Sequence, residues 1–373
     1  PRSTLFPYTT LFRSVAAALA VTAAEAQVST NLWGPGVGGD WNTGSNWTNG
    51  VAPNGAGQYI QITGQTNLGG GFTANGTLTL NASNTVGFLI WGDRDRGSQV
   101  DIRSVPGTGT LVFDSGDGRM ALLSHGSGDM NLDIGNGGDD TDAGIHVLDS
   151  EGLYIDNWQT LYLYGGATNS RALDGGGRDI VKAEDGTLVI QRITTNVNNF
   201  VVRDGKVQWN LEGNAALMPQ IANLVVGAAP GVVDSGAAHP LTNRVHAQEG
   251  TVNDRIQLPI AQLIGLNQTN YGSQAVQLTN TFNVTMNRGI LQLYNRPSTN
   301  GAPAVLAGAI TLNGDADETV IWSESQDLGA VTSSVRQMVF SGTIGGTGGF
   351  TKMASGEMTL HGTNTFTGDR KST

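Results

Sequence analysis

The sequence contains no cysteine, and this absence removes several kinds of chemistry at once. Thiolate nucleophiles, cysteine-ligated zinc and iron–sulfur clusters all need the missing sulfur. Disulfide bonds, on which many small exported domains rely, are excluded as well. A chain of 373 residues without them must obtain its stability from extended burial and backbone pairing.

Charge is also scarce, because charged residues make up 14% of the chain against roughly 25% in an ordinary domain. The net charge is −11, and the lysines are confined to Lys182, Lys206, Lys352 and Lys371. Nucleic-acid binding depends on Lys and Arg neutralising phosphates, and attachment to anionic lipid needs a basic surface. We therefore predict no nucleic-acid partner and no peripheral attachment to such a membrane.

Long apolar runs are missing too, since the nearest to one is the short Ala-rich segment Val15–Gln27. It falls short of the roughly 20 apolar residues that a bilayer-spanning helix needs. It ends in Ala24-Glu25-Ala26, the small-x-small pattern that signal peptidase cuts. We interpret residues 15–26 as the remnant of a secretory signal peptide, with a short buried helix as the alternative. This predicts a secreted or cell-surface protein.

Both ends of the sequence resemble translated sequencing adapters. Residues 1–14 read PRSTLFPYTTLFRS and residues 369–373 read DRKST, and each matches an adapter read in frame. Such artefacts are set aside before the fold is considered. We expect the natural chain to cover about residues 15–368 and to be a fragment of a longer protein.

Glycine is abundant, at 54 positions, about twice its usual share. Glycine and asparagine supply the positive φ angles of tight turns. Between glycine clusters such as Gly175–Gly177, apolar and polar residues alternate with the period of strands that bury one face. Ala215–Val226 fits a strand pair or a short helix. The alternation predicts an all-β protein with strands at Thr77–Leu80, Leu153–Ile155, Leu161–Leu163, Thr187–Ile190, Val207–Trp209, Ile290–Leu293 and Met358–Leu360.

Two stretches share a repeat frame in which a lysine precedes a glycine by four residues and two alternating apolar residues follow. One copy is set on Lys182, Gly186, Leu188 and Ile190, and the other on Lys352, Gly356, Met358 and Leu360. A weaker copy at residues 72–80 lacks the lysine. In a solenoid, each such unit covers the core of its neighbour.

Residues 340–368 read FSGTIGGTGGFTKMASGEMTLHGTNTFTG, and this glycine-punctuated run resembles the autotransporter-associated β-strand repeat. Departures from that pattern are Phe350, Ala354, Met358 and Phe366, and only Ala354 is not conservative. The clear resemblance is confined to this segment, although degenerate copies can extend further. Matching positions are Gly342, Ile344, Gly346, Gly348, Gly349, Lys352, Gly356, Leu360, Gly362, Asn364, Thr365, Thr367 and Gly368.

This resemblance implies a right-handed, single-stranded parallel β-helix over residues 61–368. It implies the passenger region of a type V-secreted protein, in which the repeat serves folding and display instead of chemistry. An outer-membrane translocator would accompany such a passenger. The resemblance also implies a Gram-negative-type bacterium, with the protein secreted or on the extracellular side of the outer membrane. Residues 31–54 resemble the opening segment of many such exported proteins. We expect residues 27–60 to form a capping segment in which Trp33, Trp41 and Trp47 cover the first coil. Stacking of sugars on exposed indoles is the alternative.

Candidate chemistry is sparse. The charge run Asp93–Arg96 fits a solvated turn, and the segment Asp139–Asp142 carries one copy of a calcium-like Gly/Asp pattern that normally needs several. Asp114, Asp117 and Asp129 fit turns, although a lateral pair of carboxylates could serve polysaccharide cleavage. No ligand-like spacing links the five histidines, which are His125, His146, His239, His246 and His361.

We therefore assign no catalytic, cofactor-binding or metal-ligating residue and predict no cofactor. Three functions stay open. The first is a structural or adhesive passenger displayed at the cell surface, which would contact extracellular carbohydrate or a neighbouring cell. The second is a carbohydrate-active β-helix enzyme, a polysaccharide lyase or hydrolase. The third is a carbohydrate-binding surface module.

Overall fold

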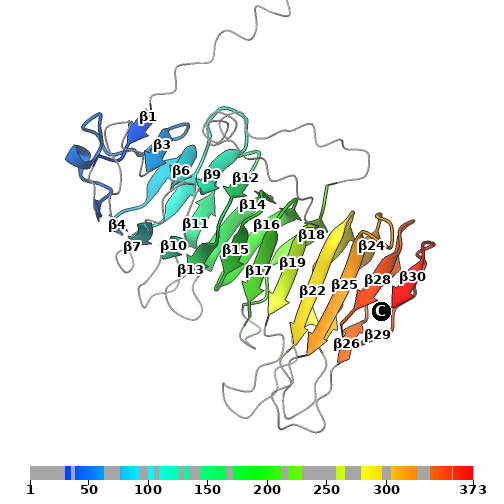
Figure 1. Cartoon of the computed structure of the whole chain (residues 1–373). Coiled ribbons are helices and arrows are strands. Elements are labelled where there is room, and N and C mark those ends of the chain that lie inside the picture. The colour runs from blue at the N-terminus through cyan, green and yellow to red at the C-terminus, as the bar shows by residue number, and fades with distance from the viewer. Residues whose placement is uncertain are drawn as a thin grey trace, which may run out of the picture.

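The computed structural model describes most of the chain as strands stacked along one axis (Figure 1). The described residues are 30–34, 38–62, 76–91, 100–104, 109–125, 130–133, 143–164, 171–211, 217–228, 258–264, 279–295, 304–325, 337–354 and 356–372. The predictions for residues 1–14 and 15–26 lie outside them. Within the described ranges the one helical element is a 3-10 turn, η1 (Gly44–Asn46), so the all-β prediction is confirmed.

A 14-stranded sheet forms one wall of the stack. Its strands are β1 (Thr30–Leu32), β3 (Tyr59–Ile62), β6 (Phe88–Trp91), β9 (Ala121–His125), β12 (Leu153–Asn157), β14 (Arg171–Ala183), β16 (Ile193–Val202), β18 (Ile221–Val226), β21 (Asn283–Met286), β24 (Ile310–Leu312) and β27 (Ile344–Gly345), with β5 (Asn84–Val86), β8 (Leu111–Phe113) and β11 (Ala143–Val147) on a side branch.

A 12-stranded sheet forms a second wall, and a 4-stranded sheet adds a third in the C-terminal part. The second wall contains β2 (Gly39–Asp40), β4 (Gly76–Leu80), β7 (Val100–Ser104), β10 (Met130–Asp133), β13 (Leu161–Tyr164), β15 (Thr187–Ile190), β17 (Lys206–Asn210), β19 (Ile260–Ile264), β22 (Gly289–Asn295), β25 (Thr319–Ser325), β28 (Phe350–Met353) and β30 (Arg370–Ser372). The third contains β20 (Thr279–Asn280), β23 (Ala304–Leu306), β26 (Gln337–Phe340) and β29 (Glu357–Leu360).

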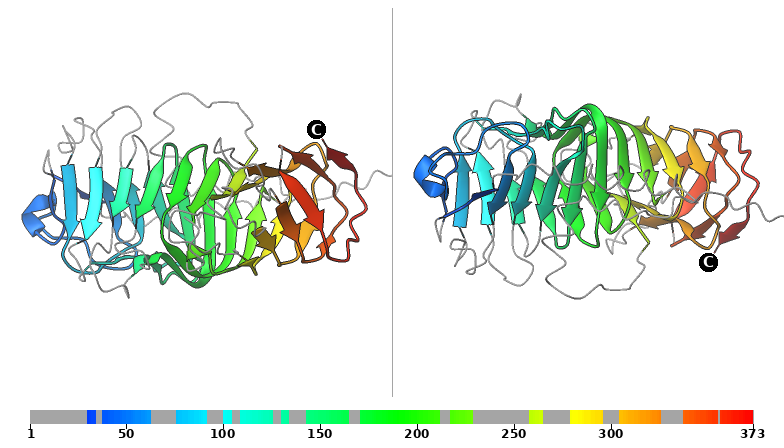
Figure 2. Two further views of the ribbon diagram at one scale, coloured as in Figure 1. Left: turned by 90° about the horizontal axis from the view of Figure 1, so that it is seen from below. Right: turned by 90° about the horizontal axis from the view of Figure 1, so that it is seen from above.

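All pairs between these described strands are parallel. Parallel neighbours need a crossover, and here the rest of a coil supplies it. β24, β25 and β26 lie on the three walls in turn, and β27, β28 and β29 repeat that order one layer further on. Figure 2 shows the resulting elongated stack, with the first strands at one end and the last at the other. This architecture is consistent with a parallel β-helix.

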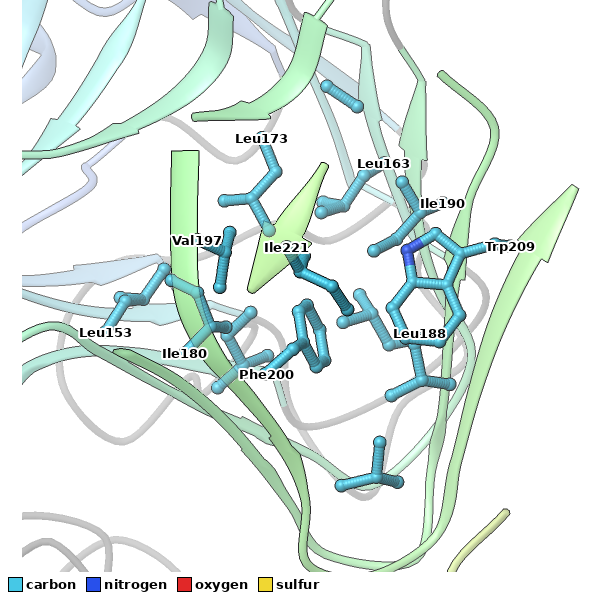
Figure 3. Close-up of a cluster of buried hydrophobic side chains, with 14 of the residues drawn as sticks. Leu153, Leu163, Leu173, Ile180, Leu188, Ile190, Val197, Phe200, Trp209 and Ile221 are labelled. Carbon is cyan, nitrogen blue, oxygen red and sulfur yellow. The ribbon is translucent and has the colours of Figure 1, made fainter. Parts of the chain in front are cut away.

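The space between the walls is filled by apolar side chains from every layer (Figure 3). Phe200 from the 14-stranded sheet meets Trp209 from the 12-stranded sheet, with ring centroids 5.0 Å apart and planes at 71°. Both side chains are buried, as are Leu153, Ile180 and Leu188 around them. Strands such as β13 and β17 bury alternate residues, as the period-2 pattern predicts, whereas β6, β9 and β12 bury every residue.

Coil length varies along the stack while the side chains stay in register. Asn199 donates to Asp179, Asn223 donates to Asn199 and Asn283 donates to Asn223, with Nδ2–Oδ1 distances of 2.9, 3.0 and 3.4 Å. The sequence separations of these three pairs are 20, 24 and 60 residues. A row of hydrogen-bonded polar side chains of this kind, here one carboxylate and three amides, holds neighbouring strands in one register. Long excursions between strands therefore leave the stacking unchanged.

The glycine cluster Gly175–Gly177 departs from the turn that its composition predicts, because it lies inside the single long strand β14. Gly176 and Gly177 have φ of 58° and 80°, and the pairing with β16 shifts register between Asp174 and Arg178. The cluster is thus a bulge that bends one strand around a corner. The N-terminal half of β14 pairs with β11, and its C-terminal half pairs with β12.

Ala215–Val226, for which a strand pair or a short helix was expected, forms the single strand β18 in its described part. The other predicted strands are all present. Three further glycine clusters were expected to form turns. Gly69–Gly71 and Gly135–Gly138 lie outside the described residues, and Gly345–Gly346 stands at the end of β27. The alternation of apolar residues therefore predicted strands more reliably than the glycine clusters predicted turns.

Candidate functional sites

The repeat frame adopts the same local structure in both copies. Lys182 Nζ donates to the carbonyl of Glu184, and Lys352 Nζ donates to the carbonyl of Ala354. Glu184 and Ala354 both have the left-handed conformation, with φ of 66° and 70°. The lysine thus satisfies a carbonyl that a tight turn points inward. The departure of Ala354 from the repeat pattern is accommodated in this conformation.

The glycine of the frame is required by a close approach of two coils. The backbone N–H groups of Gly186 and Gly356 donate to the carbonyls of Asn157 and Ser323, each at 2.9 Å. A Cβ atom at Gly186 would lie 2.5 Å from the Asn157 oxygen, and one at Gly356 would lie 2.6 Å from the Ser323 oxygen. A side chain at either position would therefore push the layers apart.

The two copies do not occupy the same corner of the coil. The Lys182 frame connects β14 of the 14-stranded sheet to β15 of the 12-stranded sheet. The Lys352 frame connects β28 of the 12-stranded sheet to β29 of the 4-stranded sheet. The frame is therefore a device for turning a corner, and it does not mark a fixed position in the coil.

A buried group of charges surrounds Lys182. Its Nζ also donates to the carbonyl of Asp204 at 3.1 Å, so this side chain ties its own turn to the turn of the next coil. Asp156 is buried on the neighbouring strand and accepts from Ser124 Oγ at 3.2 Å. Burial raises the pKa of Asp156 to about 7 and lowers the pKa of Lys182 to about 7. Burial, followed by the charges of Asp204 and Asp185, raises the pKa of Glu184.

Perturbed pKa values are typical of catalytic groups, but they also arise in structural ion networks. Here Asp156 and Lys182 are almost fully buried, and the ammonium is held by backbone carbonyls. A substrate would have to displace those contacts to reach Lys182. We interpret the cluster as a clamp between coils.

The histidines have separate environments. His125 is fully buried against Trp91, with ring centroids 5.5 Å apart, and burial lowers its pKa to about 3. His146 Nδ1 lies 3.5 Å from Asp174 Oδ2, and Arg171 approaches the same oxygen at 3.5 Å. His361 is exposed, while His239 and His246 lie outside the described residues.

Asp174 is fixed from several sides. Its Oδ1 accepts from the backbone N–H of Gly176 at 3.0 Å and from Asn196 Nδ2 at 3.1 Å. Together with His146 and Arg171, this arrangement pins the strands β11, β14 and β16 at the bulge. The described residues supply no group of three metal-ligating side chains here or elsewhere.

The carboxylates at glycine turns have local roles. Asp114 Oδ1 accepts from the backbone N–H of Gly116 at 3.0 Å, and Asp117 accepts from the backbone and side chain of Arg119 at 3.1 and 2.8 Å. These contacts match the turn interpretation of both residues. Asp129 and the segments Asp93–Arg96 and Asp139–Asp142 lie outside the described residues.

The N-terminal tryptophans are buried against one another. Trp47 contacts both Trp33 and Trp41 edge to face, with ring centroids 5.0 Å apart in each pair. Trp41 Nε1 donates to the Pro53 carbonyl at 3.0 Å, and Trp47 Nε1 donates to the Trp41 carbonyl at 2.7 Å. None of the three indoles offers an exposed face for a sugar. This geometry favours the cap over the sugar platform.

The outer face of the 12-stranded sheet carries a different arrangement, which sequence analysis did not identify. One side chain from each of six adjacent strands lines up across the strands, and we name this set the lateral row. Figure 1 shows these strands side by side, from β13 to β25. Their register partners form a continuous series: Tyr162, Val189, Gln208, Gln262, Gln292 and Trp322.

The middle of the lateral row consists of amides. Gln262 Nε2 donates to Gln292 Oε1 at 2.9 Å, and Gln208 Nε2 donates to Asn210 Oδ1 at 2.9 Å. Gln262 is 6% exposed, and its Oε1 has no hydrogen-bond partner among the described residues. Amides carry both donors and acceptors, so this stretch offers uncharged hydrogen bonding of both kinds.

Aromatic rings stand at both ends of the lateral row. Tyr162 stacks on Tyr164 of the same strand, with ring centroids 5.5 Å apart and planes at 5°. Trp322 stands beside Gln292 on the next strand. All three aromatic side chains are partly exposed. The row is bordered by Lys206, Ile260 and Ile290, which lie two residues earlier on their strands.

Comparison with known proteins identifies no relative. No family model matches the chain, and no curated protein or solved structure is significantly similar to it. The resemblance at residues 340–368 therefore stays a prediction.

The described part of the chain holds no helix with the length and apolarity that crossing a membrane requires. Any function assigned to this chain therefore depends on its fold and on the geometry of its side chains.

Proposed function

We propose that this chain is the exported, surface-displayed passenger region of a larger protein, with a structural and adhesive role. The observation that carries the proposal is the unbroken stacking of parallel coils from β1 to β30. A stack of this kind extends with each added coil, and each coil contacts only its neighbours. It suits a stalk that holds a binding face away from the cell.

The coils are proposed to form a right-handed, single-stranded β-helix. Right-handed crossovers between parallel strands are the rule because strands twist in one direction. The repeat at residues 340–368 is the pattern expected for such a passenger.

The contacts of the charged residues support a structural role. Lys182 joins successive turns, Asp174 pins the bulge, and the three tryptophans close the first coil. These groups hold layers together in an acidic protein that has no disulfide. A polysaccharide lyase or hydrolase remains the alternative hypothesis, and the lateral row described above is relevant to it.

Surface labelling of cells that produce the natural gene product tests display. An antibody raised against this chain should label intact cells, and protease added outside should remove the label. A cytoplasmic protein provides the control for intact envelopes. Labelling that appears only after permeabilisation would contradict the proposal.

A further inference from the structure

We propose that the lateral row is a binding face for an uncharged polysaccharide chain. The inference deepens the proposed adhesive function, on which it rests, by naming the ligand class and the residues that hold it. The proposed sugar-binding surface is therefore the outer face of the 12-stranded sheet. The three tryptophans of the first coil, which were the earlier candidate, are buried.

The order of side chains along the lateral row fits a glycan. A pyranose ring has two faces rich in C–H groups and an edge of hydroxyl groups. Tyr162 and Trp322 provide flat, amphipathic surfaces for the C–H faces at the two ends. Between them, Gln208 and Gln292 present amides that both donate to and accept from hydroxyl groups.

The dimensions favour an extended chain over a single sugar. Parallel strands are about 4.8 Å apart, so the five steps from Tyr162 to Trp322 cover roughly 24 Å. That length accommodates several consecutive rings lying across the strands. Tyr164 stacks on Tyr162 and so supports the orientation of that ring at one end of the row.

Gln262 provides an independent observation. Its side chain is more than nine-tenths buried in the centre of the row, yet its Oε1 accepts no hydrogen bond among the described residues. A buried acceptor without a hydrogen bond destabilises the folded protein. A hydroxyl group that reaches this oxygen after a small rotation of the amide would remove that destabilisation.

The charge of the protein favours an uncharged polysaccharide over an acidic one. None of the six residues of the lateral row is an acidic or basic residue that carries charge at neutral pH, and the whole chain has a net charge of −11. An acidic glycan would be repelled by the net negative charge of the protein, which the one lysine that borders the row, Lys206, does not offset. A neutral β-linked glucan, mannan or xylan avoids this repulsion.

Affinity gel electrophoresis of the whole chain tests the proposal. Hydroxyethyl cellulose, galactomannan and arabinoxylan serve as neutral probes, and polygalacturonate serves as the acidic probe. At least one neutral probe should retard the protein, and polygalacturonate should not. Tyr162→Ala and Trp322→Ala should each weaken retardation about fivefold, the change that corresponds to the loss of one aromatic contact of about 1 kcal/mol.

Leu148→Ala is the matched control, because Leu148 is 54% exposed and lies outside the 12-stranded sheet. Its retardation should equal that of the unchanged chain. Trp322→Phe should retain most of the binding, and thermal melts should show that every variant is folded.

Three results would overturn the proposal. They are the absence of retardation by every neutral probe, retardation by polygalacturonate alone, and a concentration-dependent dimer that Trp322→Ala abolishes, because the face would then hold a second copy of the chain. The surface-labelling experiment is independent, since a chain retained inside the cell could still bind the probes. Failure of display and failure of glycan binding are thus distinguishable.

Discussion

Replacing Lys182 with alanine should destabilise the protein by about 3–5 kcal/mol, because the change breaks a buried charge cluster. The substitution removes the donors to the carbonyls of Glu184 and Asp204, which belong to successive turns. It also leaves Asp156 and Glu184 without their buried cation. Chemical denaturation followed by circular dichroism measures the loss.

Lys352→Ala provides the matched control, because it removes the lysine of the other repeat copy. Lys352 donates to the Ala354 carbonyl in its own turn and is only partly buried. Its loss should cost about 1 kcal/mol, the net contribution of an ordinary hydrogen bond. Combining Lys182→Met with Asp156→Asn should recover part of the stability lost in Lys182→Ala, since neutral partners need no compensation. Equal losses for Lys182→Ala and Lys352→Ala would show that the clamp has no special role.

Trp41→Ala should cost about 3–5 kcal/mol in the first coils, because it removes a large buried ring and leaves a cavity. Trp41 is fully buried against Trp47 and holds the Pro53 carbonyl. In a stack with contacts between neighbours, damage at one end should stay there. Hydrogen exchange should therefore lose protection mainly in β1 and β3.

Phe200→Ala provides the comparison from the middle of the stack. Phe200 packs on Trp209 and is equally buried, so a similar local loss is expected. Protection should fall on both sides of β16, in β14 and β18, which pair with it. If Trp41→Ala instead lowered protection evenly from β1 to β30, the tryptophans would not act as a terminal cap.

Much of the fold could be predicted because strands and side chains share a period of two. The alternation at Leu161–Leu163 predicted the strand β13, in which Leu161 and Leu163 are buried and Tyr162 and Tyr164 are partly exposed. The repeat frame at Lys182 and Lys352 predicted a glycine turn leading into a strand. Alternation cannot predict which of the three walls a strand joins, because all three bury the same kinds of residue.

The lateral row was hidden for a related reason. Gln262 and Gln292 are 30 residues apart, while the coils that contain Asn223 and Asn283 are 60 residues apart. Without a constant coil length, no spacing in the sequence aligns the glutamines with Trp322. The Lys182 cluster was missed because burial of a lysine depends on which corner its turn occupies. Only the register of the strands reveals either arrangement.

The central claim is that parallel coils stack in register across long excursions of the chain, and engineered cysteines test it directly. The protein has no cysteine of its own, so an introduced pair is the sole route to a disulfide. Asn223 and Asn283 are register partners on β18 and β21. Adjacent parallel strands are about 4.8 Å apart, within the Cα range that a disulfide can bridge.

Oxidation of the double variant Asn223→Cys/Asn283→Cys should close a disulfide in nearly all molecules, as measured by intact mass and thiol titration. Asn223→Cys paired with Thr311→Cys is the control, because Thr311 lies one coil further along the stack, opposite Thr285. That pair should remain reduced under the same conditions. Efficient closure of the control pair, or no closure of the Asn223 and Asn283 pair, would contradict the stacked register.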